Sequence, residues 1–214
     1  MRTTHKIGRS ALLAGAAIGL ATGSARAQPA APTPLAAFAA QKLSVMPLQY
    51  AAAPDSGPAG SAAVATIKQA LDDSLGAALS DRGIGKNWAY AADIQRLAKR
   101  NTGYTSNPAS LGAGQLRARP LNPGDPAPVL LVSNLRSLIA LGDSRFALIP
   151  VDLAFQARDG RQRPILRLVL LDGRLGQVVW MADVAGEPFA RGTPFGAAEI
   201  GALAQRVADL VAAR

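Results

Sequence analysis

The chain has 214 residues, which at about 150 residues per domain suffices for one domain with attached segments. It contains no cysteine and a single histidine, His5, so it excludes disulfide frameworks, thiolate metal sites and cysteine nucleophiles. Its formal charge at pH 7 is +9, which in a cytosolic protein would suggest nucleic-acid binding. Histidine is also the usual group for proton transfer near neutral pH, so we expect no metal, no cofactor and no enzyme activity.

The first 27 residues have the layout of a secretory signal peptide. The basic residues at its start are Arg2, Lys6 and Arg9. An apolar stretch covers residues 11–21, too short for the roughly 20 residues that span a bilayer. Ala25 and Ala27 supply the small residues of a cleavage site before Gln28. We therefore expect export by a Sec-type signal to the periplasm or the exterior.

Cleavage after Ala27 removes four basic residues and no acidic one, which lowers the formal charge from +9 to +5. An exported basic protein meets anionic polymers or lipid surfaces, so these are possible partners and nucleic acid is not. No later stretch is apolar for 18 residues, so we expect no transmembrane segment in the mature chain. Because cysteine is absent, we also expect that the protein is not a lipoprotein.

The mature chain divides into an Ala/Pro-rich spacer at residues 28–41 and a single α/β domain at residues 42–214. The domain begins with an apolar strand at residues 42–51, and a loop follows. Apolar residues then recur every three or four positions over residues 61–83, which predicts an amphipathic helix with Lys68, Asp72 and Asp73 away from the core.

Residues 84–126 lack a clear period, and we expect an irregular insertion that contains a short basic helix at residues 91–100. Helical spacing returns at residues 128–141. Three strands are predicted at residues 145–155, 164–171 and 177–184, joined by turns with Asp-Gly pairs at Asp159 and Asp172. A helix at residues 194–213 closes the chain.

This order of elements predicts an α/β (α+β) fold. We expect a mixed sheet of about four to five strands, with an antiparallel C-terminal meander and helices packed on it.

Several motifs resemble one group of bacterial envelope proteins. They are Val45, Pro47 and Leu48 in the first strand, Asp81-Arg82-Gly83 at a helix end, the helix-to-strand stretch 135–155, and the hairpin 166–180. The group comprises the curli secretion lipoprotein, the lipoprotein activators of penicillin-binding proteins and the amino-terminal domain of the Tol translocation protein. The resemblance implies a periplasmic, non-enzymatic accessory or assembly domain that binds another envelope protein.

Two surface sites are candidates for anions or partners. Gly57, Gly60 and Ser61 lie between a strand and a helix start, where backbone N–H groups either form an ordinary capped connection or bind an anion. The second comprises Trp88, Tyr90, Arg96, Lys99 and Arg100, which form either a packed anchor beside a solvated helix face or a surface for a partner or acidic polymer.

A basic group around the predicted Asp159 turn has two interpretations as well. Arg158, Arg161, Arg163 and Arg167 form either a solvated loop or an anion-binding patch.

Two strand aspartates support an alternative function. Asp152 and Asp183 are the pair that a polysaccharide-directed hydrolase or binding protein would use, and they would have to lie on neighbouring strands in a shared cleft. A structural subunit of an envelope oligomer is a third hypothesis.

Overall fold

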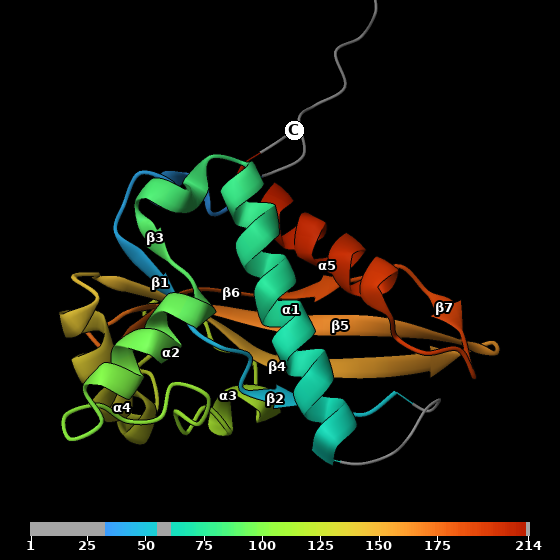
Figure 1. Cartoon of the computed structure of the whole chain (residues 1–214), viewed down its shortest axis with the longest axis horizontal. Coiled ribbons are helices and arrows are strands. Elements are labelled where there is room, and N and C mark those ends of the chain that lie inside the picture. Colours follow the sequence, from blue (N-terminus) through green and yellow to red (C-terminus); the bar gives the residue numbers. More distant parts are fainter. Residues whose placement is uncertain (1–32, 55–60, 213–214) are drawn as a thin grey trace, which may run out of the picture. The chain divides into compact units, whose positions relative to one another are not determined.

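A mixed sheet runs through the part of the chain that the structure, a computed structural model, describes: residues 33–54 and 61–212 (Figure 1). Its strands are β1 (Leu43–Val45), β2 (Tyr50–Ala51), β3 (Trp88–Ala89), β4 (Phe146–Arg158), β5 (Arg161–Asp172), β6 (Gln177–Ala185) and β7 (Phe189–Ala190). The helices are α1 (Ser61–Asp81), α2 (Ala91–Arg100), α3 (Gln115–Ala118), α4 (Val129–Leu141) and α5 (Ala197–Asp209), with 3₁₀ turns at Ala36–Phe38 and Ile84–Lys86.

Strand β4 is the centre of this sheet. The order along the main path is β3-β1-β4-β5-β6, β2 also pairs with β4, and β7 also pairs with β5. The pairs of β1 with β3 and of β1 and β2 with β4 are parallel, whereas β5 pairs antiparallel with β4, β6 and β7. The α/β prediction with an antiparallel C-terminal meander is confirmed, and the described part of the sheet has seven strands rather than four or five.

The additional strands have identifiable physical causes. The single strand expected at residues 42–51 is two short ones, because Pro47 lacks an N–H and interrupts the ladder with β4. Strand β3 lies inside the segment expected to be irregular, and β7 follows the meander. Each of these two has only two residues, too few to show a period of two in the sequence.

Helices cover both faces of the sheet and create two apolar cores. Helices α1 and α5 pack with Leu148, Leu166 and Leu168 on one face. Helix α4, with parts of α2 and residues 111–127, packs with Ile149 and Val169 on the other. The helix predicted at residues 61–83 is α1, and Gly83 ends it with a left-handed φ of 75°. Leu35, expected in the spacer, is fully buried in the first core.

Asp72 departs from its predicted place on the solvent face of α1. It is 7% exposed, and its Oδ1 accepts a hydrogen bond of 2.9 Å from the Leu48 N–H. One turn earlier, the Lys68 ammonium donates to the Gln49 carbonyl at 3.0 Å. The expectation failed because the Leu48 N–H, next to Pro47, donates its hydrogen bond to a side chain of α1, although the N–H groups of Met46 and Gln49 still donate to β4.

Burial raises the pKa of Asp72 from 3.8 to about 7, although the Leu48 N–H and the Lys68 charge act in the opposite direction and Asp73 adds to the rise. The folded state therefore retains a proton that the unfolded state releases in this interval. This contribution to stability is complete below the unfolded pKa and is lost as the pH rises through the folded one. Asp143, Asp172 and Asp183 have lowered pKa values, so they titrate below this window.

We expect the free energy of unfolding to decrease between about pH 4.5 and pH 7.5, by up to about 1.4 kcal/mol for each unit of pKa difference. Asp72→Asn should flatten this slope, because the amide oxygen still accepts from Leu48 without titrating. Urea unfolding across this range measures both effects. Asp81→Asn, at the exposed end of α1, is the matched control and should retain the slope. An identical slope in wild type and Asp72→Asn would contradict this account.

Candidate binding surfaces

The two strand aspartates lie on the same face of the sheet, but not on neighbouring strands. The register places Asp152 of β4 opposite Arg167 of β5, and Arg167 opposite Asp183 of β6. A register shift between Pro150 and Asp152 turns the Asp152 side chain to this face. The requirement of neighbouring strands is therefore not met, since an arginine separates the two carboxylates.

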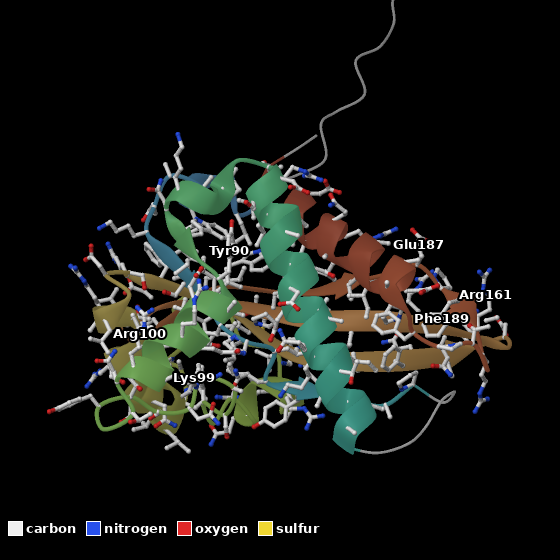
Figure 2. The ribbon with its side chains drawn as sticks, in the orientation of Figure 1. Tyr90, Lys99, Arg100, Arg161, Glu187 and Phe189 are labelled. Carbon is white, nitrogen blue, oxygen red and sulfur yellow. The ribbon has the colours of Figure 1, made fainter. Side chains whose placement is uncertain are left out.

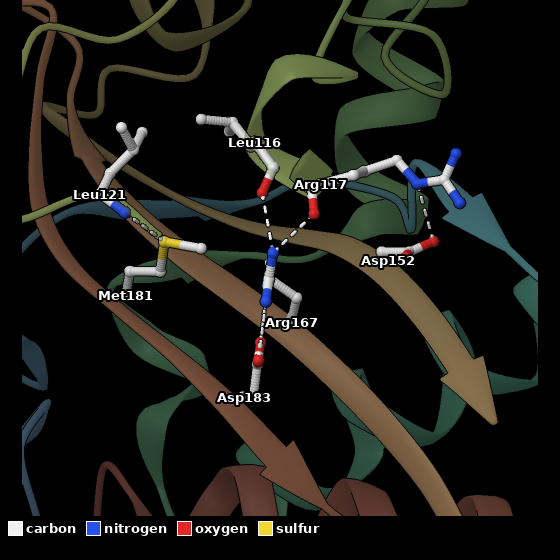
Figure 3. A network of polar contacts seen from close by, with 7 residues as sticks. All are labelled: Leu116, Arg117, Leu121, Asp152, Arg167, Met181 and Asp183. Atoms are coloured by element: carbon white, nitrogen blue, oxygen red, sulfur yellow. Dashed lines mark hydrogen bonds and ion pairs between the residues drawn. The ribbon is translucent and has the colours of Figure 1, made fainter. Parts of the chain in front are cut away.

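The Arg167 side chain donates hydrogen bonds to β6 and to the backbone of α3 (Figure 3). Its Nε and Nη2 donate to the two carboxylate oxygens of Asp183 at 2.7 and 2.8 Å. Its Nη1 donates to the Arg117 carbonyl at 2.7 Å. Arg117 in turn places its Nε 3.1 Å from Asp152 and its guanidinium 4.7 Å from the centre of the Tyr50 ring. These contacts hold α3 against the sheet, and we call Arg117, Asp152, Arg167 and Asp183 together the Arg167 clamp.

The ion pairs of the Arg167 clamp disfavour a general acid at Asp183. The hydrogen bonds of Arg167 hold the pKa of the Asp183 carboxyl below its usual range. A general acid of a glycosidase needs a raised pKa. The arrangement therefore supports a structural clamp rather than the hydrolase of the alternative hypothesis.

The fold separates the aromatic residues of the predicted partner surface, Trp88 and Tyr90, from its basic residues. Trp88 is 4% exposed, packs in the core with α1 and α5, and donates from Nε1 to the Phe38 carbonyl at 3.2 Å. Tyr90 is half-buried beside Gly76 of α1, and burial together with Asp93 raises its pKa. Figure 2 shows Lys99 and Arg100 on α2, away from Tyr90. The anchor interpretation therefore fits the two aromatic residues.

The remaining basic residues of that surface stay at the periphery. Arg96 forms an ion pair with Asp93 on its own helix, and Lys99 and Arg100 are exposed in its last turn. Tyr104, which follows α2, is 85% exposed. A partner surface at this position stays a prediction.

Other sequence candidates lie outside the described residues. The cleavage site at Ala25, Ala27 and Gln28 belongs to residues 1–32, and Gly57 and Gly60 belong to residues 55–60. Ser61 is the first residue of α1. In the described ranges, no three His, Cys, Asp or Glu residues gather as metal ligands. No described helix has the length and apolarity needed to cross a bilayer.

Sequence reasoning missed an apolar groove at the start of α4, which we call the α4 groove. Val129 and Leu130 are 86% and 62% exposed, although both are large apolar residues. Leu130 closes over Gly112, where a Cβ atom would lie 2.9 Å from its Cδ2, and Gly112 has a φ of 83°. The groove has a volume of about 410 Å³, with Leu116 and Leu121 in its lining and Arg119 beside them.

The sequence carries one signal for the α4 groove. The first turn of α4 contains no acidic residue, and Pro128 before it provides no side-chain cap. Helix starts usually carry Ser, Thr, Asp or Asn caps and acidic residues. Val129 and Leu130 stand in the first turn of α4 instead, so apolar side chains lie where polar ones are usual.

The chain is similar to several solved structures, all at TM-scores below 0.5. Lipoprotein GNA1162 from Neisseria meningitidis is 14% identical, with a TM-score of 0.41 over 79% of this chain and 96% of that one. E. coli LpoB is 14% identical, with a TM-score of 0.39 over 87% and 84%. A PelC dodecamer from Paraburkholderia phytofirmans is 13% identical, with a TM-score of 0.37 over 86% and 92%.

These matches agree with the envelope lipoprotein group that the sequence resemblance named. At identities of 12–16% the likeness concerns the fold alone. No protein-family profile matches the chain, and no curated protein sequence matches it.

The expectation that the protein is not a lipoprotein is wrong. The finding against it is the similarity to GNA1162, which is a lipoprotein by its own name. The expectation rested on the absence of cysteine from the chain.

Replacing the central cation of the clamp should destabilise the protein. Arg167→Met leaves the Asp183 carboxylate without its guanidinium and the Arg117 carbonyl without its donor, and we expect the free energy of unfolding to decrease by about 1–3 kcal/mol. Arg163→Met, on the same face of β5, is the matched control and should change it by less than about 0.5 kcal/mol. Urea unfolding at neutral pH measures both, and equal effects would contradict the clamp.

Proposed function

We propose that the protein is an exported, non-enzymatic accessory protein of the cell envelope that binds an envelope partner through the α4 groove. The observation that carries this proposal is the exposure of Val129 and Leu130 beside a groove of about 410 Å³. The accessory role accords with the fold, which the chain shares with exported envelope proteins.

Exposed apolar surface supports binding on physical grounds. Each large apolar side chain left in water forfeits about 1.5–3 kcal/mol of burial free energy, and clustered ones mark interaction sites on soluble domains. Val129 and Leu130 are adjacent on the first turn of α4, and their helix is held by Leu131, Leu135 and Leu138 in the core. A rigid helix that presents two apolar side chains loses little entropy when a partner covers them.

The chemistry of the groove narrows the class of partner. Its lining combines leucine and proline side chains with one arginine, Arg119, and the amide of Gln115. An apolar segment that carries a carboxylate complements this combination, because the aliphatic part fills the groove and the acid pairs with Arg119. A protein segment therefore fits better than a sugar, which would leave the exposed Val129 and Leu130 without apolar contacts.

Photo-crosslinking tests the binding site inside cells. A photoreactive residue in place of Leu130 should give a discrete adduct with a second protein, and Val129→Asp should abolish that adduct. The matched control places the photoreactive residue at Leu141, which is 44% exposed at the other end of α4 and should give no such adduct. Adducts at both positions, or at neither, would contradict the proposal, and so would an adduct between two copies of the chain.

The export step has its own test. We expect the protein recovered from the cell envelope to begin at Gln28, since Ala25 and Ala27 match the small residues that signal peptidase requires. Ala27→Arg should block cleavage and leave the first 27 residues attached. N-terminal sequencing distinguishes the two forms. A wild-type protein that retains Met1 in the envelope would overturn the assignment.

A further inference from the structure

The β4–β5 hairpin carries a second site, independent of the α4 groove. Its turn is Arg158-Asp159-Gly160-Arg161, in which Asp159 and Gly160 both have positive φ, of 51° and 72°. Two such residues form the tight turn whose twist matches that of paired strands. The turn therefore sets the register, with Arg158 opposite Arg161 and Gln156 opposite Arg163.

This register gathers three guanidinium groups on one face of the hairpin. Side chains directly opposite each other in an antiparallel pair share a face, so Arg158, Arg161 and Arg163 emerge together. Like charges placed opposite each other destabilise a sheet. Arg167, grouped with them by sequence proximity, lies on the same face but is engaged by Asp183.

The hairpin face is hollowed into a cleft of about 260 Å³ between β4, β5 and Pro188. Arg161 donates from Nη2 to the Pro188 carbonyl at 2.8 Å, which holds its guanidinium at the edge of the cleft. Arg158 pairs with Asp159 at 3.2 Å, but both side chains are almost fully exposed, so this ion pair is weak. Within the described residues, no hydrogen bond or ion pair engages the Arg163 side chain, and Glu187 forms an ion pair with Arg206.

The opposite face of the hairpin is rigid. Phe155, Phe189 and Phe195 pack there with ring centres 5.1 to 6.1 Å apart, and Gln162 is fully buried. The Arg191 N–H donates to the Gly160 carbonyl at 2.9 Å and so fastens the turn. Figure 2 shows Arg161, Glu187 and Phe189 together at this end of the sheet, far from Lys99 and Arg100 on α2. The backbone that carries the three arginines is therefore held in place from the opposite face.

We propose that this cleft binds a phosphomonoester group. Three guanidiniums against the single carboxylate of Asp159 leave a local charge that a phosphate dianion balances. Guanidinium forks donate in pairs to tetrahedral oxyanions, a geometry that lysine cannot reproduce. The volume accommodates the phosphate with a few atoms of whatever carries it.

The test uses the full-length protein and nuclear magnetic resonance. Inorganic phosphate and glucose 6-phosphate should shift the backbone amides of residues 156–163 saturably. Arg161→Gln and Arg163→Gln should each weaken the binding about tenfold, and Arg161→Lys should not restore it fully. The matched control is Arg174→Gln, in the turn of the β5–β6 hairpin, which should bind as wild type does. Unfolding midpoints confirm that the variants fold.

Two further measurements decide the class and source of the ligand. Acetate at equal ionic strength should not produce the shifts, and equal shifts with acetate would overturn the proposal. Vesicles of phosphatidylcholine that contain phosphatidic acid are compared with vesicles of phosphatidylcholine alone. Binding to the first kind only indicates a lipid phosphate, and binding to neither indicates a free phosphorylated compound. Shifts that are not saturable, or that survive Arg161→Gln and Arg163→Gln unchanged, would also overturn it. Because these variants leave the α4 groove intact, failure here would not affect the proposed function.

Discussion

The register shift in β4 between Pro150 and Asp152 is the constraint on which the rest of the sheet depends. Before it, Leu148 faces α1 and α5 while Ile149 faces α4. Without the extra residue, strict alternation would direct Asp152 into the core beneath α1 and α5, and Leu153 to the opposite face. The shift instead keeps Leu153 buried and aligns Asp152 with Arg167 and Asp183. Pro150 tolerates this position because it has no N–H to pair.

A second constraint joins the layers above and below the sheet. The backbone between β1 and β2 passes Pro47, and its polar groups are satisfied from elements far away in sequence. Asp72 accepts from Leu48, and the Gln49 side chain donates to the carbonyls of Pro47 and Pro108 and accepts from the Leu111 N–H. This buried network ties α1 to the sheet and holds the 108–111 loop in place. Gly112, which lines the α4 groove, directly follows this loop, so the network also holds one wall of the groove in place.

The two proposed sites lie on different elements and use different physics. The α4 groove is apolar with a single arginine and would desolvate a protein segment. The hairpin cleft is cationic and would exchange water for phosphate oxygens. In Figure 1, α4 and the tip of the β4–β5 hairpin with β7 are at opposite ends of the sheet. One molecule can therefore engage both ligands at once. The clamp at Arg167 lies between them and holds α3 against the strands.

The sequence by itself determined the elements whose signals are local. Residues 61–83 and 128–141 show helical spacing over many turns, and the Asp-Gly pairs at Asp159 and Asp172 predict tight hairpins, so α1, α4 and the meander were predictable. The mixed α/β sheet followed from their order. Only the tertiary structure decided the burial of Asp72 and Trp88, the existence of β2, β3 and β7, and the separation of Asp152 from Asp183 by Arg167. Each of these depends on a partner distant in sequence or on a one-residue change of register, and neither leaves a periodic trace in the sequence. The exposure of Val129 and Leu130 belongs to the same class, because the packing of α4 on the sheet decides which of its apolar residues remain in water.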